Sequence, residues 1–350
     1  MRTNLSSQIS LNHVSPRYYK PENAVERSVL TRLEKIPTDI FETIEEGVRH
    51  IADEVAAKIQ ERQREGKFCT LAIGTGTSLR PLFTELVRRH KDEGLSFRNV
   101  VVFNLYEFYP LTEGNGSTFG QLNSLFLSQT DIDRQNVFTI DGSIPQNAIS
   151  EHCRLYEQRI QTFGGIDIVL MGIGREGNIG MNEPGSHASS PTRLILLDAT
   201  SRSEAARNWG VDNLPPCSIT MGVQTILSAR KIYLLTWGED RADIIQKAVE
   251  ENVNDTLPAS FLQLHNNVNV CIDLAAASHL TRIQRPWLVT SCEWNDKLIR
   301  SAIVWLCTLL NKPILKLTNK DYNENGLSEL LALYGSAYNV NIKVFNDLQH

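Results

Sequence analysis

The feature that most constrains the fold is an apolar run that stops at a group of glycines. Residues 166–171 read Ile-Asp-Ile-Val-Leu-Met, and four glycines follow within the next nine residues. A short apolar run bounded by glycine is typical of a buried strand. The loop after it carries two carboxylates and two amides, so we expect the strand to deliver a functional site formed by Glu176, Asn178, Asn182 and Glu183.

The same glycines have the spacing of a dinucleotide-binding fingerprint. They form G-x-G-x-x-G from Gly172, and Asp198 follows the third of them by about twenty residues. The fingerprint functions only when its third glycine opens a helix whose N-terminus faces the pyrophosphate. Pro184 and Pro191 predict that no long helix fits between Asn178 and Thr192, so NAD binding is disfavoured.

Composition and charge limit the class of protein. The chain has 350 residues, 41% of them hydrophobic, and a net charge of −5, which allows one large core or two smaller ones. Without a sustained basic tract, nucleic acid and anionic membranes are disfavoured as main partners. No signal-like or membrane-spanning segment is visible, so we expect a cytoplasmic protein. The six separated cysteines predict reduced thiols rather than a zinc site.

Strand and helix patterns alternate along the middle of the chain. We expect strands over 68–73, 100–104, 166–171, 194–197, 218–221 and 231–236. We expect helices over 40–64, 81–90, 122–128, 149–163, 203–208, 223–228 and 240–251. This order predicts a Rossmann-like α/β fold: a mostly parallel sheet with helices on both faces and ligands at the carboxyl ends of its strands.

The chain divides into three expected segments. Residues 1–35 are polar and proline-punctuated, as in an arm, and residues 36–284 form the α/β domain. From 285 onward we expect a C-terminal α/β appendage, with strands over 313–317 and 342–345 around a helix over 327–334. Its last residues show no terminator, which is compatible with a further domain after it.

A glycine- and hydroxyl-rich turn joins an expected strand to an expected helix at Gly74-Thr75-Gly76-Thr77-Ser78. Backbone N–H groups, hydroxyls and the helix dipole of such a turn suit a phosphate. An ordinary capped βα turn is the alternative. Arg202 and Arg241 are candidate cations for the same phosphate, with solvated surface positions as their alternative.

Carboxylates supply the candidate acids and bases. Glu107 lies in the segment 103–110 that closes the expected strand over 100–104, and it is an acid or base candidate or a turn cap. Glu176 and Glu183 lie seven residues apart in the glycine loop, where they either converge on one site with separated pKa values or are simply solvated.

Four motifs taken in order resemble the glucosamine-6-phosphate deaminase family. They are the turn at 74–78, Phe103-Asn104-Leu105-Tyr106-Glu107-Phe108, the loop at 172–184, and Ser190-Pro191-Thr192-Arg193. The resemblance extends from about Ile40 to Asp273. It implies the fold shared with 6-phosphogluconolactonase and ribose-phosphate isomerase, no cofactor or metal, and conversion of glucosamine 6-phosphate and water to fructose 6-phosphate and ammonia in amino-sugar catabolism.

The resemblance also assigns residues by position. Phosphate would be held by Thr75, Gly76, Thr77, Ser78, Arg202 and Arg241, and Glu183 matches a glutamate that supports ring opening. The chain departs from the family at two places: Tyr106 stands where the family has the aspartate base, and Asn178 stands where it has a histidine. Glu176 replaces an aspartate, and Glu107, Glu176 or Glu183 is left to take over the base role.

Three functions follow from these residues. The first is an amino-sugar-phosphate deaminase or isomerase. The second is a sugar-phosphate-binding pseudoenzyme or regulatory module, motivated by Tyr106 and Asn178. The third is a phosphosugar lactonase, although that loop also normally carries a histidine where Asn178 stands. In each case the partner is a small-molecule sugar phosphate, and the resemblance implies a homo-oligomer.

Overall fold

The computed structural model describes residues 14–112, 116–209 and 214–349, which divide into two compact units. The first unit spans residues 34–279, and the second combines residues 14–33 with 280–349. The boundaries expected from the sequence were 35/36 and 284/285. The sequence did not indicate that the segment before residue 34 groups with the C-terminal residues.

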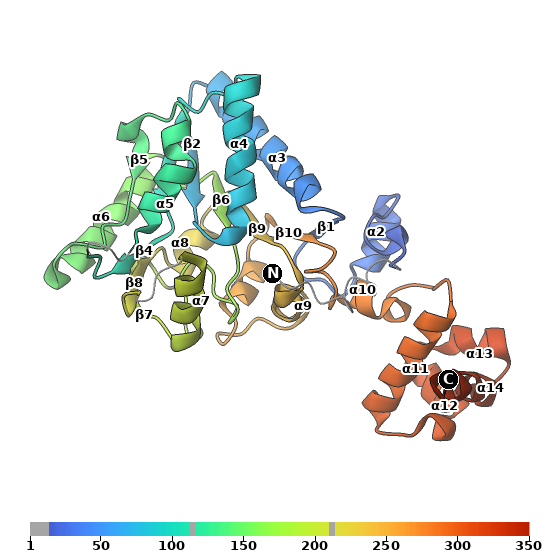
Figure 1. Ribbon diagram of the computed structural model, residues 1–350. Coiled ribbons are helices and arrows are strands. Elements are labelled where there is room, and N and C mark those ends of the chain that lie inside the picture. The colour runs from blue at the N-terminus through green and yellow to red at the C-terminus, as the bar shows by residue number, and fades with distance from the viewer. Residues whose placement is uncertain (1–13, 113–115, 210–213, 350) are drawn as a thin grey trace. The chain divides into compact units, whose positions relative to one another are not determined.

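The first unit is built on a seven-stranded parallel sheet (Figure 1). Its order is β1-β10-β9-β6-β2-β3-β5, and each neighbouring pair is parallel. The strands are β1 (Thr38–Phe41), β2 (Cys69–Ile73), β3 (Val100–Asn104), β5 (Val137–Phe138), β6 (Ile168–Met171), β9 (Lys231–Thr236) and β10 (Val268–Asp273). The predicted α/β fold with a mostly parallel sheet is therefore confirmed.

Helices cover both faces of this sheet. One face packs against α3 (Ile44–Arg64), α4 (Arg80–Glu93) and α5 (Thr118–Leu125), with Ile51, Phe83 and Val102 in the shared core. The other face packs against α6 (Ile149–Thr162), where the rings of Phe103 and Tyr156 lie 5.4 Å apart. Successive strand residues point to opposite faces, so Val102 packs into the core on one face of the sheet and Phe103 packs on the other face. The remaining helices of this unit are α7 (Ala199–Trp209), α8 (Val223–Leu227) and α9 (Ala242–Glu250).

A second, antiparallel sheet was not anticipated. It has the order β4-β8-β7 and contains β4 (Tyr106–Tyr109), β8 (Cys217–Thr220) and β7 (Arg193–Leu196). The strand expected over 100–104 is observed as β3, but the residues that follow it form a separate strand, because the chain leaves the large sheet at Leu105. The Leu105 N–H donates to Ile73 O at 3.0 Å and its carbonyl accepts from Met221 N at 2.7 Å, so one residue joins both sheets.

Other predicted boundaries shift for local reasons. The helix expected from Ile40 begins at Ile44, because the Thr43 side chain caps it by accepting a hydrogen bond from Glu46 N at 3.1 Å. Ile40 belongs to β1 instead. Strands β1, β5 and β10 were not predicted.

The order of the strands creates a crevice. The chain passes from β2 to β3 and β5 on one side, whereas β6, β9, β10 and β1 lie on the other. At such a topological switch point the loops after two adjacent strands diverge and leave room for a ligand. Here those are the loops that begin at Gly74 after β2 and at Gly172 after β6.

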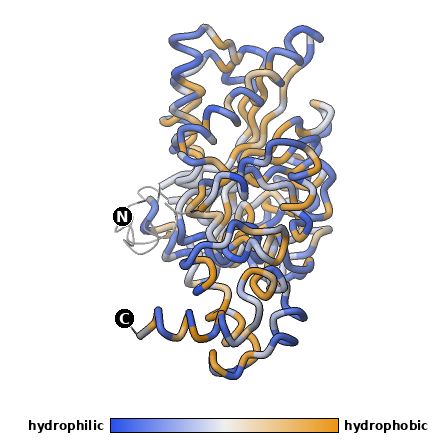
Figure 2. The backbone as a smooth tube through the Cα atoms, turned by 90° about the vertical axis from the view of Figure 1, so that its right-hand side faces the viewer, coloured by the Kyte–Doolittle hydropathy of each residue, from blue (hydrophilic) through white to orange (hydrophobic). Residues whose placement is uncertain are grey.

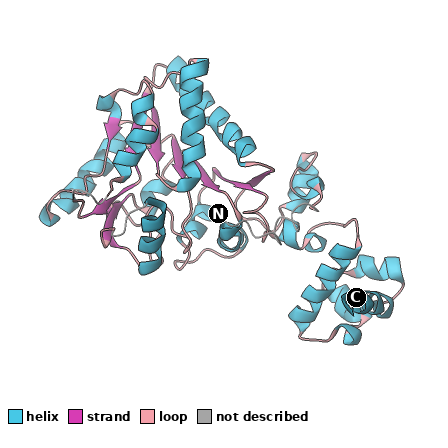
Figure 3. Cartoon of the chain, in the orientation of Figure 1, coloured by secondary structure: helices cyan, strands magenta, loops and turns pink. Residues whose placement is uncertain are grey.

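The described residues of the second unit form helices and connecting loops and contain no strand (Figure 3). It contains α2 (Ala24–Leu30), α10 (Thr281–Gln284), α11 (Asp296–Leu310), α12 (Asn319–Glu324), α13 (Ser328–Tyr334) and α14 (Ala337–Gln349). The strands expected over 313–317 and 342–345, and hence an α/β appendage, are wrong. Ile314–Lys316 forms a single 3₁₀ turn, and residues 342–345 lie inside α14.

The reason is the four-residue spacing of buried side chains in α14. Val340 and Val344 are both at most 1% exposed and pack with Ile303 and Leu330, which is the period of a helix face rather than a strand. Figure 2 shows hydrophobic and hydrophilic residues alternating in short blocks along the helix that ends at the C-terminus.

In the part of the chain that the structure describes, no helix is long and apolar enough to cross a membrane. All six cysteines are free, and Cys69, Cys153 and Cys271 are buried. Within the same residues, no three His, Cys, Asp or Glu side chains gather as a metal-binding group.

We predict that Val340→Ala lowers the free energy of unfolding of the second unit by about 2 kcal/mol, because it leaves a cavity among packed helices. Tyr338→Ala, at a side chain that is 69% exposed in the same helix, serves as control and should change stability by less than about 0.5 kcal/mol. Chemical denaturation followed by circular dichroism measures both. Equal effects of the two substitutions would contradict the packing of α14.

Candidate active site

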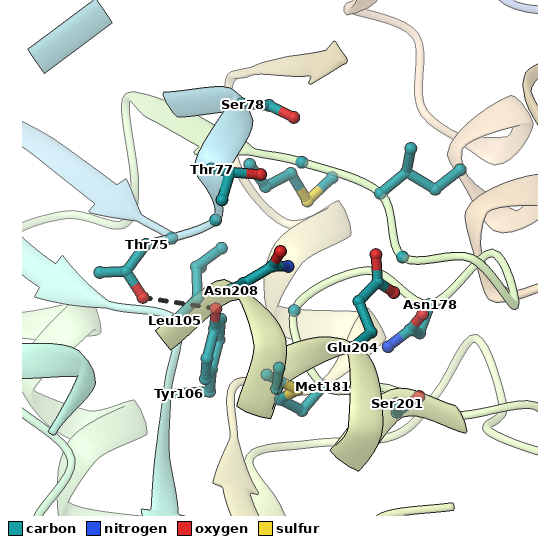
Figure 4. A pocket seen from close by; sticks show the side chains of 18 of the residues that line it. Thr75, Thr77, Ser78, Leu105, Tyr106, Asn178, Met181, Ser201, Glu204 and Asn208 are labelled. Carbon is teal, nitrogen blue, oxygen red and sulfur yellow. Dashed lines mark hydrogen bonds between the residues drawn. The ribbon is translucent and has the colours of Figure 1, made fainter. Parts of the chain in front are cut away.

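A polar pocket opens at the carboxyl ends of β2 and β6, where the switch point places it (Figure 4). Its lining combines the turn after β2, the glycines after β6, the start of β4, and residues from α7 and from the segment before α9. The residues that matter for the chemistry are Thr75, Gly76, Thr77, Ser78, Arg80, Tyr106, Asn178, Ser201, Glu204 and Arg241.

The predicted phosphate turn forms one wall. All four of its predicted residues, Thr75 to Ser78, line the pocket, and α4 begins directly after the turn and its 3₁₀ residues Thr77–Leu79. A hydrogen bond from a residue outside the pocket lining holds the turn in place: Trp237 Nε1 donates to Ser78 O at 2.9 Å. Free N–H groups at the start of a helix, together with hydroxyls, form a site suited to an anion.

The two predicted cations have different positions. Arg241 lines the pocket, whereas Arg202 is not among the lining residues and its Nη2 donates to Leu214 O at 3.1 Å. Sequence reasoning missed Arg80, an exposed lining residue whose Nη2 donates to Asn208 O at 3.2 Å. The sequence signal that could have identified Arg80 is its position as the first residue of the helix that follows the turn.

Tyr106 and Asn178 both line the pocket, but neither has the chemistry of a base. Thr75 Oγ1 donates to the Tyr106 hydroxyl at 3.3 Å, and burial raises the pKa of Tyr106 above its ordinary value. The phenol is therefore neutral at pH 7 and can only exchange hydrogen bonds. The Asn178 amide is buried, and its Oδ1 has no hydrogen-bond partner among the described residues.

Glu183 lies in a buried position behind the pocket. It is 9% exposed, and its Oε2 accepts from Ser201 Oγ at 3.0 Å, a side chain that itself lines the pocket. Its Oε1 is buried without a hydrogen-bond partner in the described structure. Burial, helped by Asp198, raises the pKa of Glu183 to about 7, which suits a group that gives and takes a proton near neutral pH.

The hydrogen bonds of Glu107 indicate a structural role. Its two carboxylate oxygens accept from Phe108 N, Ser117 Oγ, Thr118 N and Phe119 N, at 2.7–3.1 Å. These donors include the free N–H groups at the start of α5, so the carboxylate caps that helix. Glu107 is 1% exposed and is not among the lining residues.

Glu176 is placed apart from this chemistry. Its side chain is exposed on the glycine loop and does not line the pocket. The loop brings Glu183, rather than Glu176, to the residue Ser201 that borders the pocket.

Backbone packing explains two of the loop's glycines. A Cβ on Gly174 would lie 1.8 Å from Asn178 Oδ1, and Gly177 has φ +74° with a built Cβ 2.1 Å from Leu257 Cδ1. Residues 178–192 contain no helix, so the helix that a dinucleotide fingerprint requires is absent there, as predicted.

The charged residues of the lining include an ion pair that the sequence did not reveal. Arg241 Nη2 donates to Glu204 Oε1, while Arg241 Nη1 donates to Asp240 Oδ2 at 3.1 Å and Arg241 Nε to Ile173 O at 3.2 Å. Arg175 N donates to Glu204 Oε2 at 3.2 Å. The pocket therefore presents both signs of charge.

Comparisons with known proteins identify the class. The family described as glucosamine-6-phosphate isomerases/6-phosphogluconolactonase matches residues 42–271, and the chain belongs to this family.

Relatives of this chain carry names that refer to glucosamine-6-phosphate deaminase. A Bacteroides thetaiotaomicron protein, whose name calls it glucosamine-6-phosphate deaminase-like, is 66% identical over all of this chain, which spans 53% of its length. Glucosamine-6-phosphate deaminase 1 of Bacillus subtilis is 36% identical, over 64% of this chain and 93% of its own.

Solved structures agree with the fold. A monomeric glucosamine-6-phosphate deaminase superposes with a TM-score of 0.66 and 34% identity, covering 70% of this chain and 100% of its own. The 6-phosphogluconolactonase of Thermotoga maritima, at 16% identity and a TM-score of 0.54, covers 68% of this chain and 98% of its own. The second likeness concerns the fold alone.

We predict that Glu107→Gln lowers the free energy of unfolding by about 2–4 kcal/mol, because an amide nitrogen would face N–H donors that now meet a carboxylate. Glu45→Gln, an exposed substitution in the first turn of α3, is the control. Urea denaturation measures both. A Glu107→Gln protein of unchanged stability that no longer turns over substrate would instead make Glu107 catalytic.

The raised pKa of Glu183 makes stability depend on pH. Its folded pKa of about 7 lies above its ordinary value of 4.5, so the folded state holds the proton more tightly, and stability falls as pH rises from about 4.5 through 7. Glu183→Gln mimics the protonated form. The free energy of unfolding of Glu183→Gln relative to wild type should rise by roughly 2 kcal/mol between pH 5.5 and pH 8.5. Urea denaturation of both proteins at the two pH values measures this difference. A gap that does not change with pH would show that Glu183 keeps an ordinary pKa.

Proposed function

We propose that this protein is an amino-sugar-phosphate deaminase that converts glucosamine 6-phosphate and water to fructose 6-phosphate and ammonia. The observation that carries the proposal is one pocket with an anion-binding turn at the start of α4 and, behind Ser201, a buried carboxylate whose pKa is near 7. Membership of the deaminase-containing family supports it.

The reaction needs groups that the pocket can supply. The turn from Thr75 to Ser78, with Arg80 and Arg241, would hold the phosphate. Opening of the sugar ring and transfer of the C2 proton to C1 give an imine, and water then replaces the nitrogen at C2 to release ammonia. Glu183 would exchange protons with the substrate through Ser201 Oγ, since Ser201 borders the pocket and Glu183 does not.

The role of Tyr106 in this scheme is that of a hydrogen-bond donor. A phenol with a raised pKa holds its proton at pH 7, so it would steady a substrate oxygen rather than remove a proton. Asn178 would likewise orient a hydroxyl. The proton transfers then fall to the carboxylates.

A second candidate function is a sugar-phosphate-binding module without turnover. The neutral side chains of Tyr106 and Asn178, at the places where the family resemblance has an aspartate and a histidine, favour it. The proposal of a deaminase also includes a homo-oligomeric assembly, which the family resemblance implies, and a cytoplasmic setting, which was expected from the sequence.

The test is release of ammonia and fructose 6-phosphate from glucosamine 6-phosphate, beside an enzyme-free blank. We expect turnover by the wild-type protein, a loss of about 100-fold or more in kcat in Glu183→Gln, and kcat within about twofold of wild type in Glu45→Gln. Tyr106→Phe should retain more activity than Glu183→Gln, because it removes a hydrogen bond rather than a proton carrier.

Calorimetry with the same ligand separates the two functions. Absence of turnover with retained binding of glucosamine 6-phosphate would leave the binding module as the better account. Turnover that is equal in wild type and Glu183→Gln would exclude Glu183 as the proton carrier.

A further inference from the structure

Glu204 is a carboxylate in a pocket that otherwise suits an anion. It lies in α7, lines the pocket with Asn178 and Ser201, and its side chain is 14% exposed (Figure 4). The residues of the phosphate turn, Thr75 to Ser78, form another part of the same lining. A carboxylate beside bound phosphate is repelled by it, so the presence of Glu204 requires a reason.

The carboxylate is currently neutralised by a cation that a phosphate would also attract. Arg241 Nη2 donates to Glu204 Oε1, and both side chains are at most 14% exposed. A phosphate that recruits Arg241 competes with this ion pair. Glu204 would then retain the backbone N–H of Arg175 at 3.2 Å and the Arg175 guanidinium, whose Nε lies 3.8 Å from Oε1.

We propose that Glu204 binds the protonated amine of the substrate and thereby selects amino-sugar phosphates over sugar phosphates that carry a hydroxyl at the same carbon. This inference rests on the proposed function. The ligand brings one phosphate and one ammonium group, and the pocket offers Arg241 with the turn for the first and Glu204 for the second. One ion pair of the protein is replaced by two ion pairs with the ligand.

The selectivity follows from the state of Glu204 when the bound ligand has no amine. Such a ligand would draw Arg241 toward phosphate without providing Glu204 with a new cation in its place. The poorly solvated carboxylate would then keep only its contacts with Arg175, and the loss of its closer ion-pair partner is costly. Discrimination therefore comes from a penalty against the wrong ligand as well as from attraction to the right one. Removing the charge of Glu204 should relieve that penalty.

The experiment is isothermal titration of two matched ligands, glucosamine 6-phosphate and glucose 6-phosphate, which differ at C2. At pH 6.5 the amine is protonated, since comparable amines titrate near about 8. We expect the wild-type protein to bind the amino sugar at least about tenfold more tightly. In Glu204→Gln, and in Glu204→Ala as a second variant, the two Kd values should come within about threefold, with glucose 6-phosphate bound more tightly than by wild type.

Asp240→Asn is the matched control. Asp240 also accepts a hydrogen bond from Arg241, at 3.1 Å, but its side chain is 60% exposed and does not line the pocket. It should shift the affinities for both ligands in parallel and preserve their ratio. The contrast separates recognition of the amine from a general effect on Arg241.

Two results would overturn the proposal. One is equal affinity of the wild-type protein for the two ligands, and the other is parallel weakening of both in the Glu204 variants, which indicates a merely structural role. The proposed function fails separately: amine-selective binding that disappears in Glu204→Gln, in a protein without turnover, supports the role of Glu204 and contradicts the deaminase activity.

Discussion

The pairing of β2 with β6 is the interaction on which the rest of the site depends. These strands are hydrogen-bonded in parallel from Leu71 with Ile168 to Ile73 with Leu170, and the pairing continues one step further where Gly74 N donates to Leu170 O at 2.9 Å. Only beyond that bond do the two chains separate. The predicted phosphate turn and the glycine loop therefore start from one fixed point, which sets where these two segments enter the pocket.

Much of the fold could be read from local patterns, and the failures have local causes. The strand over Lys231–Thr236 was predicted with its observed limits because its short apolar run contains the strand-favouring residues Ile232, Tyr233 and Thr236. Residues 342–345 also contain strand-favouring residues, Ile342, Val344 and Phe345, but lie in a helix, since Val340 and Val344 share a buried face. Composition suggests a strand there, and only packing against α11 and α13 decides for a helix.

The site was predictable where one segment supplies it and unpredictable where several converge. The turn from Thr75 to Ser78 was found because its glycine and hydroxyl residues are adjacent in sequence. Glu204 and Arg80 carry no motif, and their place in the lining depends on how α7 and α4 lie against the sheet. Glu107 illustrates the opposite problem: a motif position marks a carboxylate, but three of its four donors lie at the start of α5 and meet it only in the folded chain.

The distribution of charge links these observations. Three of the carboxylates in or near the pocket region have different environments. Glu107 is held by neutral donors, Glu183 is buried with a raised pKa, and Glu204 is paired with Arg241. Tyr106 and Asn178, which are part of the pocket lining, are both uncharged at pH 7. Since neither side chain is charged at pH 7, the function we propose leaves proton transfer to Glu183 and recognition of the amine to Glu204. On that scheme the chemistry and the selectivity of the pocket can be altered independently.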